Sequence, residues 1–219
     1  MMHKPIQFKN LSLSFPHKIC FAEFSGQITY GSRIAMIGRN GSGKSTLLKW
    51  FAGLIDPSEG EIKYPTECRV GYVPQLIDAF DSFSGAQRFN KALTEALSLS
   101  PDILMLDEPT NHLDCNNRRS LIRMLRAFEG TLIMVTHDVE LLNATVETIW
   151  HIDNGRVAVF SGCYDDYQRE MKIQRAAIAD ELADLNRKKE QAHHALMQEQ
   201  AYYPKNPTYH KKTAPDNLA

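Results

Sequence analysis

A glycine-rich stretch near the start of the chain has the residue types and spacing to hold phosphate. The sequence GRNGSGKST, from Gly38 to Thr46, fits the pattern GxxxxGK[ST] between a predicted strand and a predicted helix. Glycines allow backbone angles that turn successive N–H groups inward around an anion. We expect Lys44 to place a cation on the β- and γ-phosphates and Ser45 to offer its hydroxyl to Mg²⁺. The remaining predicted nucleotide-binding positions of the loop are Asn40, Gly41, Ser42 and Gly43.

Two adjacent acids follow an apolar run in ILMLDEPTNHLD, residues 103–114. The run predicts a buried strand, so both acids lie at the carboxyl end of a strand, where open parallel sheets bind ligands. We expect Asp107 to hold Mg²⁺, directly or through water, and Glu108 to orient and deprotonate an attacking water. A solvated turn is the alternative for two adjacent acids, and the apolar strand before them argues against it.

Two more polar residues end predicted strands. His137, in VTHD, is predicted to reach a γ-phosphate and sense its presence. Gln75, in YVPQ, is predicted to reach Mg²⁺ or the attacking water through its amide. A lone histidine usually has only a structural role, and Gln75 alone is weak evidence. The neighbouring motifs favour a functional role for both residues.

The elements that position these residues alternate between strands and helices, which predicts an α/β fold with helices flanking a parallel sheet. The apolar runs typical of buried strands are 33–38, 103–107 and 131–138. The predicted helices are 44–53, 86–98 and 116–128. Other strands are expected at 6–14 (with a slip near Asn10), 18–28, 61–64 and 69–73, and a hairpin at 147–160 turning at Asp153, Asn154 and Gly155.

The character of the sequence changes after Gly162. Residues 164–200 contain neither proline nor glycine, and their apolar residues fall near helical spacing, so they predict a long charged helix with a narrow apolar stripe. A dimerisation coiled coil and a solvated helix are both alternatives for it. We predict an ATP-binding domain at 1–162, a helical extension at 163–200 and a flexible tail at 201–219.

Bulk properties narrow the class of protein. The 219 residues include 25 basic and 26 acidic side chains, and this net charge of −1 gives no global attraction to nucleic acid or anionic membrane, although a local patch could bind either. We expect no DNA partner. The four cysteines form no CxxC pair, which favours free thiols in a reducing compartment. No apolar run approaches the ~20 residues that span a bilayer, and no signal peptide is recognisable, so we expect a cytoplasmic protein without membrane insertion.

Together these motifs resemble the ATP-binding cassette ATPases, in the family's order across residues 6–160. The resemblance implies a P-loop core with an N-terminal antiparallel β subdomain, ATP and Mg²⁺ as ligands, and ATP hydrolysis. It assigns Phe15 to stacking on adenine, Asp114 to the D-loop, and Lys44, Glu108 and His137 to catalysis. It also implies a head-to-tail dimer with a second cassette, in which a signature loop contacts the nucleotide of the opposite subunit. The signature residues here are Ser84, Gly85 and Gln87, with Ala86 in place of a glycine.

The motif LDEPTNHLD narrows the resemblance to the F subfamily, soluble tandem-cassette proteins that act on the ribosome. In that subfamily a charged helical linker follows the first cassette, and residues 161–191 look like the start of such a linker. The chain therefore looks like the first half of such a protein or a free-standing relative. The cluster Arg187-Lys188-Lys189 is a candidate contact for RNA phosphate.

Two features depart from the family pattern. Only eight residues, Leu76 to Phe83, separate Gln75 from the signature loop, where the family inserts a helical subdomain. Two alternative functions are the nucleotide-binding subunit of a transporter and a non-hydrolysing ATP-dependent switch. A near-absent subdomain argues against the transporter subunit and favours the switch. Ala86 would cost on the order of 1 kcal/mol if its position required a positive φ.

Overall fold

The computed structural model describes residues 4–77, 84–111 and 113–202, with side chains to residue 198. The chain divides into two compact units, Met1–Gln168 and Arg169–Ala219. The first unit holds every strand of the described residues, and the second holds most of one long helix. The flexible tail predicted at 201–219 lies almost wholly outside the described residues.

The larger sheet of the first unit has six strands in the order β5-β6-β7-β3-β8-β9. Adjacent strands are parallel from β5 to β8, and β9 is antiparallel to β8. The central strands are buried along their whole length because helices and a second sheet cover them, which explains their continuous apolar sequences. The strands are β3 (Arg33–Gly38), β5 (Val70–Val73), β6 (Ile103–Asp107), β7 (Thr131–Val135), β8 (Thr148–Asp153) and β9 (Arg156–Ser161).

A smaller antiparallel sheet has the order β2-β1-β4. Its strands are β1 (Ile6–Phe15), β2 (Lys18–Ile28) and β4 (Glu59–Lys63). The pairing of β1 with β2 shifts between Phe8 and Leu11, and Asn10 has a φ of 52° there. The slip expected near Asn10 is therefore a β-bulge, which re-aims the strand so that Leu11 and Leu13 stay buried.

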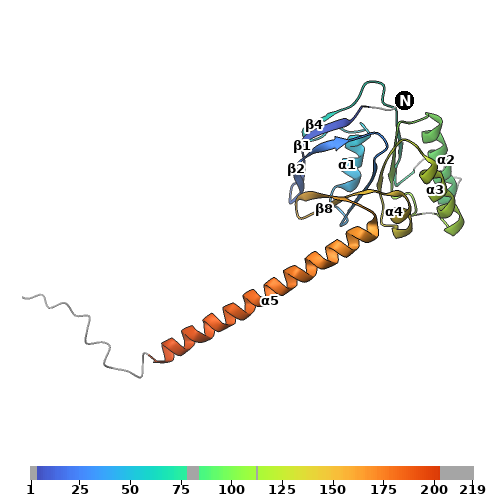
Figure 1. Ribbon diagram of the computed structural model, residues 1–219. Helices are drawn as coiled ribbons and strands as arrows, with labels where there is room; N and C mark the ends of the chain where they lie inside the picture. Colours follow the sequence, from blue (N-terminus) through green and yellow to red (C-terminus); the bar gives the residue numbers. More distant parts are fainter. Residues whose placement is uncertain (1–3, 78–83, 112, 203–219) are drawn as a thin grey trace, which may run out of the picture. The chain divides into compact units, whose positions relative to one another are not determined.

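Five helices are found in the described residues: α1 (Lys44–Phe51), α2 (Gly85–Ser98), α3 (Cys115–Ala127), α4 (Val139–Thr145) and α5 (Tyr164–Tyr202). Figure 1 shows α1 beside the β1–β2–β4 sheet, with α2 and α3 at the other side of this unit. Helix α4 was not predicted from the sequence, and the strand predicted at 131–138 ends at Val135. The chain leaves β7 after Val135, and the Asp138 carboxylate caps α4 by accepting from the Leu141 N–H at 3.1 Å.

The main core lies between the two sheets, with α1 inside it. Phe8 from β1 lies 5.2 Å from Phe51 at the end of α1 and 5.7 Å from Trp150 on β8, measured between ring centroids. Aromatic contacts of this kind bury large apolar areas and fix relative orientation. Through this packing the antiparallel sheet, helix α1 and the larger sheet share one hydrophobic core.

These observations confirm the predicted α/β architecture with an antiparallel β subdomain and a long C-terminal helix. All four cysteines are free thiols. Among the described helices none is both long enough and apolar enough to cross a membrane. Within α5, residues 169–198 are almost all exposed, including Ile178, Leu182 and Leu185 of the predicted stripe.

Candidate nucleotide site

The glycine-rich loop connects the carboxyl end of β3 to the first residue of α1. Gly43 is the N-cap residue of α1 and has a φ of 93°, and no side chain caps the helix. A Cβ atom at Gly43 would lie only 2.5 Å from Leu13 Cδ2, so both the backbone angle and the space require glycine. The first-turn N–H groups of α1 are therefore left open, and a helix N-terminus of this kind attracts anions.

Lys44, the first residue of α1, holds the loop together. Its Nζ donates to the carbonyl oxygens of Gly38 at 2.8 Å and Arg39 at 3.0 Å. Burial lowers the pKa of the Lys44 ammonium, while the carboxylates of Glu108 and Asp107 act in the opposite direction. The lysine thus bonds to the loop carbonyls and interacts electrostatically with the two acids at the end of β6.

Ser45 and Asp107 form the second part of the site. The Ser45 hydroxyl donates to Asp107 Oδ1 at 3.1 Å, although the two residues are far apart in sequence. Burial raises the pKa of the Asp107 carboxyl, and the bond from Ser45 opposes that change. Ser45 and Gln75 line one cavity, and the Asp107 carboxylate is bonded to Ser45; a hydroxyl, an amide and a carboxylate are oxygen donors that suit Mg²⁺. In the described parts of the chain no group of three or more His, Cys, Asp or Glu is placed to bind a metal, so phosphate oxygens would have to complete such a site.

Glu108 and His137 form the third part. The imidazole Nε2 lies 3.3 Å from Glu108 Oε1. Glu108 has a φ of 49°, and its N–H donates to the Val135 carbonyl at 2.7 Å. Burial raises the pKa of the Glu108 carboxyl, and the nearby His137 opposes this. A glutamate held in a left-handed backbone conformation stores strain of the kind found at functional sites.

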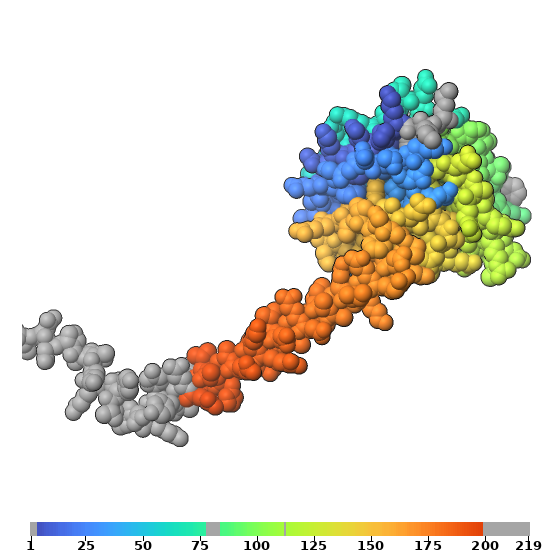
Figure 2. Space-filling view, viewed as in Figure 1, coloured from blue at the N-terminus to red at the C-terminus, as the bar shows by residue number. Residues whose placement is uncertain are grey.

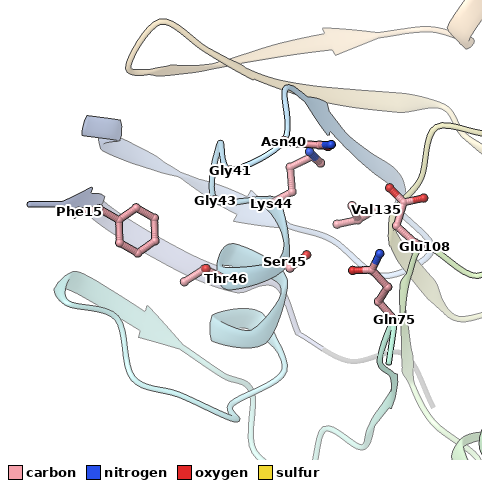
Figure 3. A pocket seen from close by; sticks show the side chains of 10 residues that line it. All are labelled: Phe15, Asn40, Gly41, Gly43, Lys44, Ser45, Thr46, Gln75, Glu108 and Val135. Atoms are coloured by element: carbon pink, nitrogen blue, oxygen red, sulfur yellow. The ribbon is translucent and has the colours of Figure 1, made fainter. Parts of the chain in front are cut away.

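These parts surround one open cavity of about 330 Å³, shown in Figure 3. Phe15 stands at one end of it, half exposed, and Glu108 and Gln75 lie at the other end beyond Ser45. Because β3, β5, β6 and β7 are parallel, their carboxyl ends bring these side chains to one edge of the sheet. The cavity is lined by Phe15, Asn40, Gly41, Gly43, Lys44, Ser45, Thr46, Gln75, Glu108 and Val135.

Comparison with known proteins identifies the domain. Residues 21–76 match the family model described as "ABC transporter", and residues 84–143 match one described as "AAA domain, putative AbiEii toxin, Type IV TA system". ABC transporter F family member 3 of Arabidopsis thaliana is 30% identical in an alignment that covers 75% of this chain and 29% of the relative. The chain contains an ATP-binding cassette ATPase domain. The two models leave residues 77–83 unmatched.

Two bacterial relatives match this chain at a similar identity. The probable ATP-binding protein YheS of Escherichia coli K12 is 29% identical, with 75% of this chain and 32% of the relative covered. The ribosome protection protein VmlR of Bacillus subtilis is also 29% identical, with 77% and 35% covered. The chain thus spans about a third of the length of these relatives.

Solved structures confirm the fold of the cassette. A dimeric ATP-binding cassette in a post-hydrolysis state with ADP and phosphate superposes with a TM-score of 0.63 at 19% identity, covering 71% of this chain and 98% of the other. A bacterial Atm1-family exporter with ATP bound gives 0.64 at 21% identity, covering 77% and 40%. At these identities the likeness establishes the P-loop fold.

The structure places the predicted signature residues of the cassette at the N-terminus of α2, outside the cavity lining. Ser84 is the N-cap: its hydroxyl accepts from the Gln87 N–H at 3.4 Å, and the Gln87 side chain accepts from the Ser84 N–H at 2.9 Å. Gly85 and Ala86 follow in the first turn, and Ala86 has an ordinary negative φ. The strain considered for Ala86 therefore does not arise.

Asp114 also lies outside the cavity lining, as the N-cap of α3, where its carboxylate accepts from the Asn117 N–H at 2.8 Å. Among the other predicted residues, Ser42 is buried within the loop, and its hydroxyl has no hydrogen-bond partner in the described residues. His112 of the motif lies outside the described residues. The roles of Ser84, Gly85, Gln87 and Asp114 at a partner's nucleotide stay predictions.

One residue beside the phosphate loop was missed. The Lys18 Nζ donates to the Gly41 carbonyl at 3.0 Å, and its charge contributes to the lowered pKa of Lys44. Lys18 follows Phe15 by three residues, after the turn between β1 and β2. A lysine so close to a predicted adenine-stacking aromatic was a usable signal, but only the fold of the hairpin brings it to the loop.

Proposed function

We propose that this cassette binds Mg-ATP in the cavity and hydrolyses it to ADP and phosphate. The observation that carries the proposal is the meeting of three pairs at one sheet edge: Lys44 with the loop carbonyls, Ser45 with Asp107, and Glu108 with His137. Phosphate-binding and water-activating groups are both required for hydrolysis, and both are within reach of one cavity.

Each residue has one task in this proposal. The open N–H groups of α1 and the Lys44 ammonium bind the β- and γ-phosphates, and Phe15 stacks on the adenine. Ser45, Asp107 and Gln75 would hold Mg²⁺. When bound, that ion neutralises charge on the β- and γ-phosphate oxygens. The loop glycines hold the triphosphate in line for attack, which supplies the positioning on which phosphoryl transfer depends.

The hydrolytic step uses Glu108 as the base. Water attacks the γ-phosphorus, Glu108 takes the water's proton, and the bond from the γ-phosphorus to the β,γ-bridging oxygen breaks, leaving ADP. His137 orients the Glu108 carboxylate through its 3.3 Å contact and is placed to reach the γ-phosphate. The raised pKa of Glu108 suits a group that must accept a proton near neutral pH.

The test compares phosphate release and nucleotide affinity in three variants of the full chain. Glu108→Gln should keep nucleotide binding and lose turnover, and Lys44→Ala should lose both. Glu95→Gln, which removes an exposed acid on α2, serves as the matched control and should behave as wild type. Unchanged turnover in Glu108→Gln would exclude Glu108 as the base.

A second cassette is part of the proposal, supplied by another copy or by a partner half. It is supported by the dimeric state of a structural neighbour and by the helix N-terminus at Ser84, which carries N–H groups suited to a phosphate on another subunit. Glu108→Gln with ATP should shift the mass measured by light scattering from monomer to dimer. A monomer at all nucleotide concentrations would argue that the shortened segment after Gln75 prevents closure.

We further propose that the protein acts on the ribosome in the cytoplasm, with residues 163–200 as a helical extension of a cassette at 1–162. The support is the relationship to a ribosome protection protein and to F-type relatives, together with a 39-residue charged helix. Cosedimentation with ribosomes should be strongest for Glu108→Gln in ATP. Absence of enrichment in every nucleotide state would refute this role.

A non-hydrolysing switch is the second candidate, and one observation favours it. Only eight residues separate Gln75 from Ser84, and Ser84 and Gln87 already satisfy each other's hydrogen bonds. Under this alternative ATP binds but phosphate release stays at background in wild type. Turnover that both Lys44→Ala and Glu108→Gln abolish would exclude it.

A further inference from the structure

Helix α3 carries four arginines and no acidic residue. Arg118 is engaged in the fold, because its Nε lies 2.9 Å from Asp138 Oδ2. The other three are exposed and occur at helical spacing, where 100° per residue puts them within about 60° of one another and roughly opposite the buried Leu121. We call this set the arginine face; its members are Arg119, Arg123 and Arg126.

The arginine face makes little contribution to the fold. Within the described residues none of its three side chains forms an ion pair with a carboxylate, and Arg123 Nη2 donates a hydrogen bond to Ser120 Oγ at 3.3 Å. Arg33 shows the contrast, since its guanidinium donates to the Leu125 and Phe128 carbonyls at the end of the same helix. Like charges four residues apart destabilise a helix, so the arginine face needs another explanation.

An open groove runs beside the arginine face. Besides Arg119 and Arg123, it is lined by Asn116, Ser120, Ile122 and Glu140, around a cavity of about 710 Å³. Asn116 and Ser120 provide an amide and a hydroxyl next to two guanidinium groups. Glu140, at the start of α4, is the acid that faces the groove, and it forms no ion pair with the arginines.

We propose that the arginine face binds the sugar–phosphate backbone of RNA. This inference rests on the proposed ribosomal role and names the chemistry of the partner. Guanidinium groups match phosphate oxygens with paired N–H donors, and a helical rise of 1.5 Å per residue spaces successive arginines along the axis by about 6 and 4.5 Å. The groove's amide and hydroxyl suit ribose hydroxyls.

Other partners fit this surface less well. A membrane-bound helix would place large exposed apolar side chains beside its cations, whereas the exposed residues flanking the arginine face are Cys115, Asn116, Ser120 and Ala127. A protein interface would centre on an exposed large apolar or aromatic anchor, whereas the apolar residue of this groove, Ile122, is only partly exposed. Figure 2 shows this part of the chain, in yellow-green, at the surface of the cassette.

The test measures binding of the full chain to a fluorescein-labelled single-stranded RNA by anisotropy, at several KCl concentrations between 50 and 200 mM. One variant replaces the arginine face: Arg119→Gln, Arg123→Gln and Arg126→Gln together. The matched control removes the same charge from exposed residues of three strands: Lys9→Gln, Lys63→Gln and Arg156→Gln. Glutamine keeps helix propensity high and retains polarity. Circular dichroism and binding of a fluorescent ATP analogue report on the fold.

The arginine-face variant should bind RNA about tenfold more weakly at 50 mM KCl, and the slope of log affinity against log salt should fall by about 2, at about 0.7 per lost phosphate contact. The control should keep the wild-type slope. Equal losses in both variants, or no RNA binding by wild type, would overturn the proposal. So would equal competition by poly-glutamate or by phosphatidylserine vesicles, which would assign the surface to an acidic protein or a membrane. Intact ATP binding in the variant separates these outcomes from failure of the nucleotide site.

Discussion

Two helix N-termini of this cassette are predicted to meet phosphate, and they are built in opposite ways. Helix α1 begins after Gly43, whose left-handed backbone leaves the first N–H groups without a side-chain cap. Helix α2 begins after Ser84, which forms a complete capping box with Gln87. In the first case no side chain occupies the first-turn donors, and in the second the Ser84 and Gln87 N–H groups are already bonded within the chain.

This difference suggests that nucleotide binding by one cassette and closure of a dimer on that nucleotide are separate steps. An anion at α1 meets donors that nothing else occupies, so the loop is organised for phosphate in a single cassette. An anion at α2 must compete with the Ser84 and Gln87 side chains, so binding there costs the loss of internal hydrogen bonds. The nucleotide of one cassette is therefore expected to bind first, and contact with a second cassette to be the weaker step.

The largest expected effect comes from removing the cation at α1. Lys44→Ala takes away a charged donor and leaves the Gly38 and Arg39 carbonyls without their partner. Hydrogen bonds to charged groups contribute about 1.5–3 kcal/mol each, so ATP affinity should fall by at least about tenfold to a hundredfold. Titration with a fluorescent ATP analogue measures this, and a change below about threefold would contradict the assigned role.

Giving α1 a side-chain cap should be the next most harmful change. Gly43→Ser places a side chain at a φ of 93° and 2.5 Å from Leu13 Cδ2. The backbone alone costs about 1–2 kcal/mol, and the overlap adds to it. Urea unfolding and ATP titration should both show a loss. Gly31→Ala is the matched control, because Gly31 has a φ of 77° with nothing within 4 Å of the added Cβ, and it should leave ATP affinity unchanged.

Opening the α2 end should have a smaller effect of a different kind. Ser84→Ala removes one half of the capping box and should lower the free energy of unfolding by about 1 kcal/mol, without changing ATP affinity of the single cassette. Chemical denaturation and nucleotide titration distinguish the two quantities. A large loss of ATP affinity would show that Ser84 acts on the nucleotide of its own cassette.

The smallest effect concerns the residue that departs from the signature pattern. Ala86→Gly should lower the free energy of unfolding by about 0.5–1 kcal/mol, because Ala86 lies in a helix with an ordinary φ and glycine has more freedom to lose there. The same denaturation measurement gives the sign. Increased stability would mean that alanine is strained at this position, contrary to the structure.

Much of the site was predictable from local sequence because each motif follows an apolar run. Gly38, Asp107 and His137 all come at or just after the ends of buried strands, and parallel strands place their carboxyl ends at one edge. Helix α4 was missed because seven residues are too few to show helical periodicity, although Asp138 carried a capping signal. Lys18 was missed because it lies on β2 and its contact, Gly41, lies in the phosphate loop, and no local sequence pattern links the two.

The sequence by itself determined which residues can bind phosphate, and that the chain is an α/β protein, because glycine spacing and apolar periodicity act over a few neighbouring residues. Only the tertiary structure decided that Ser45 bonds to Asp107 and that His137 meets Glu108, because those pairs form across separate strands. It also decided that the N-terminus of α1 has no side-chain cap and that the N-terminus of α2 has a capping box. A φ value and a capping hydrogen bond depend on how the preceding loop enters the helix, and packing against Leu13 settles that entry at Gly43.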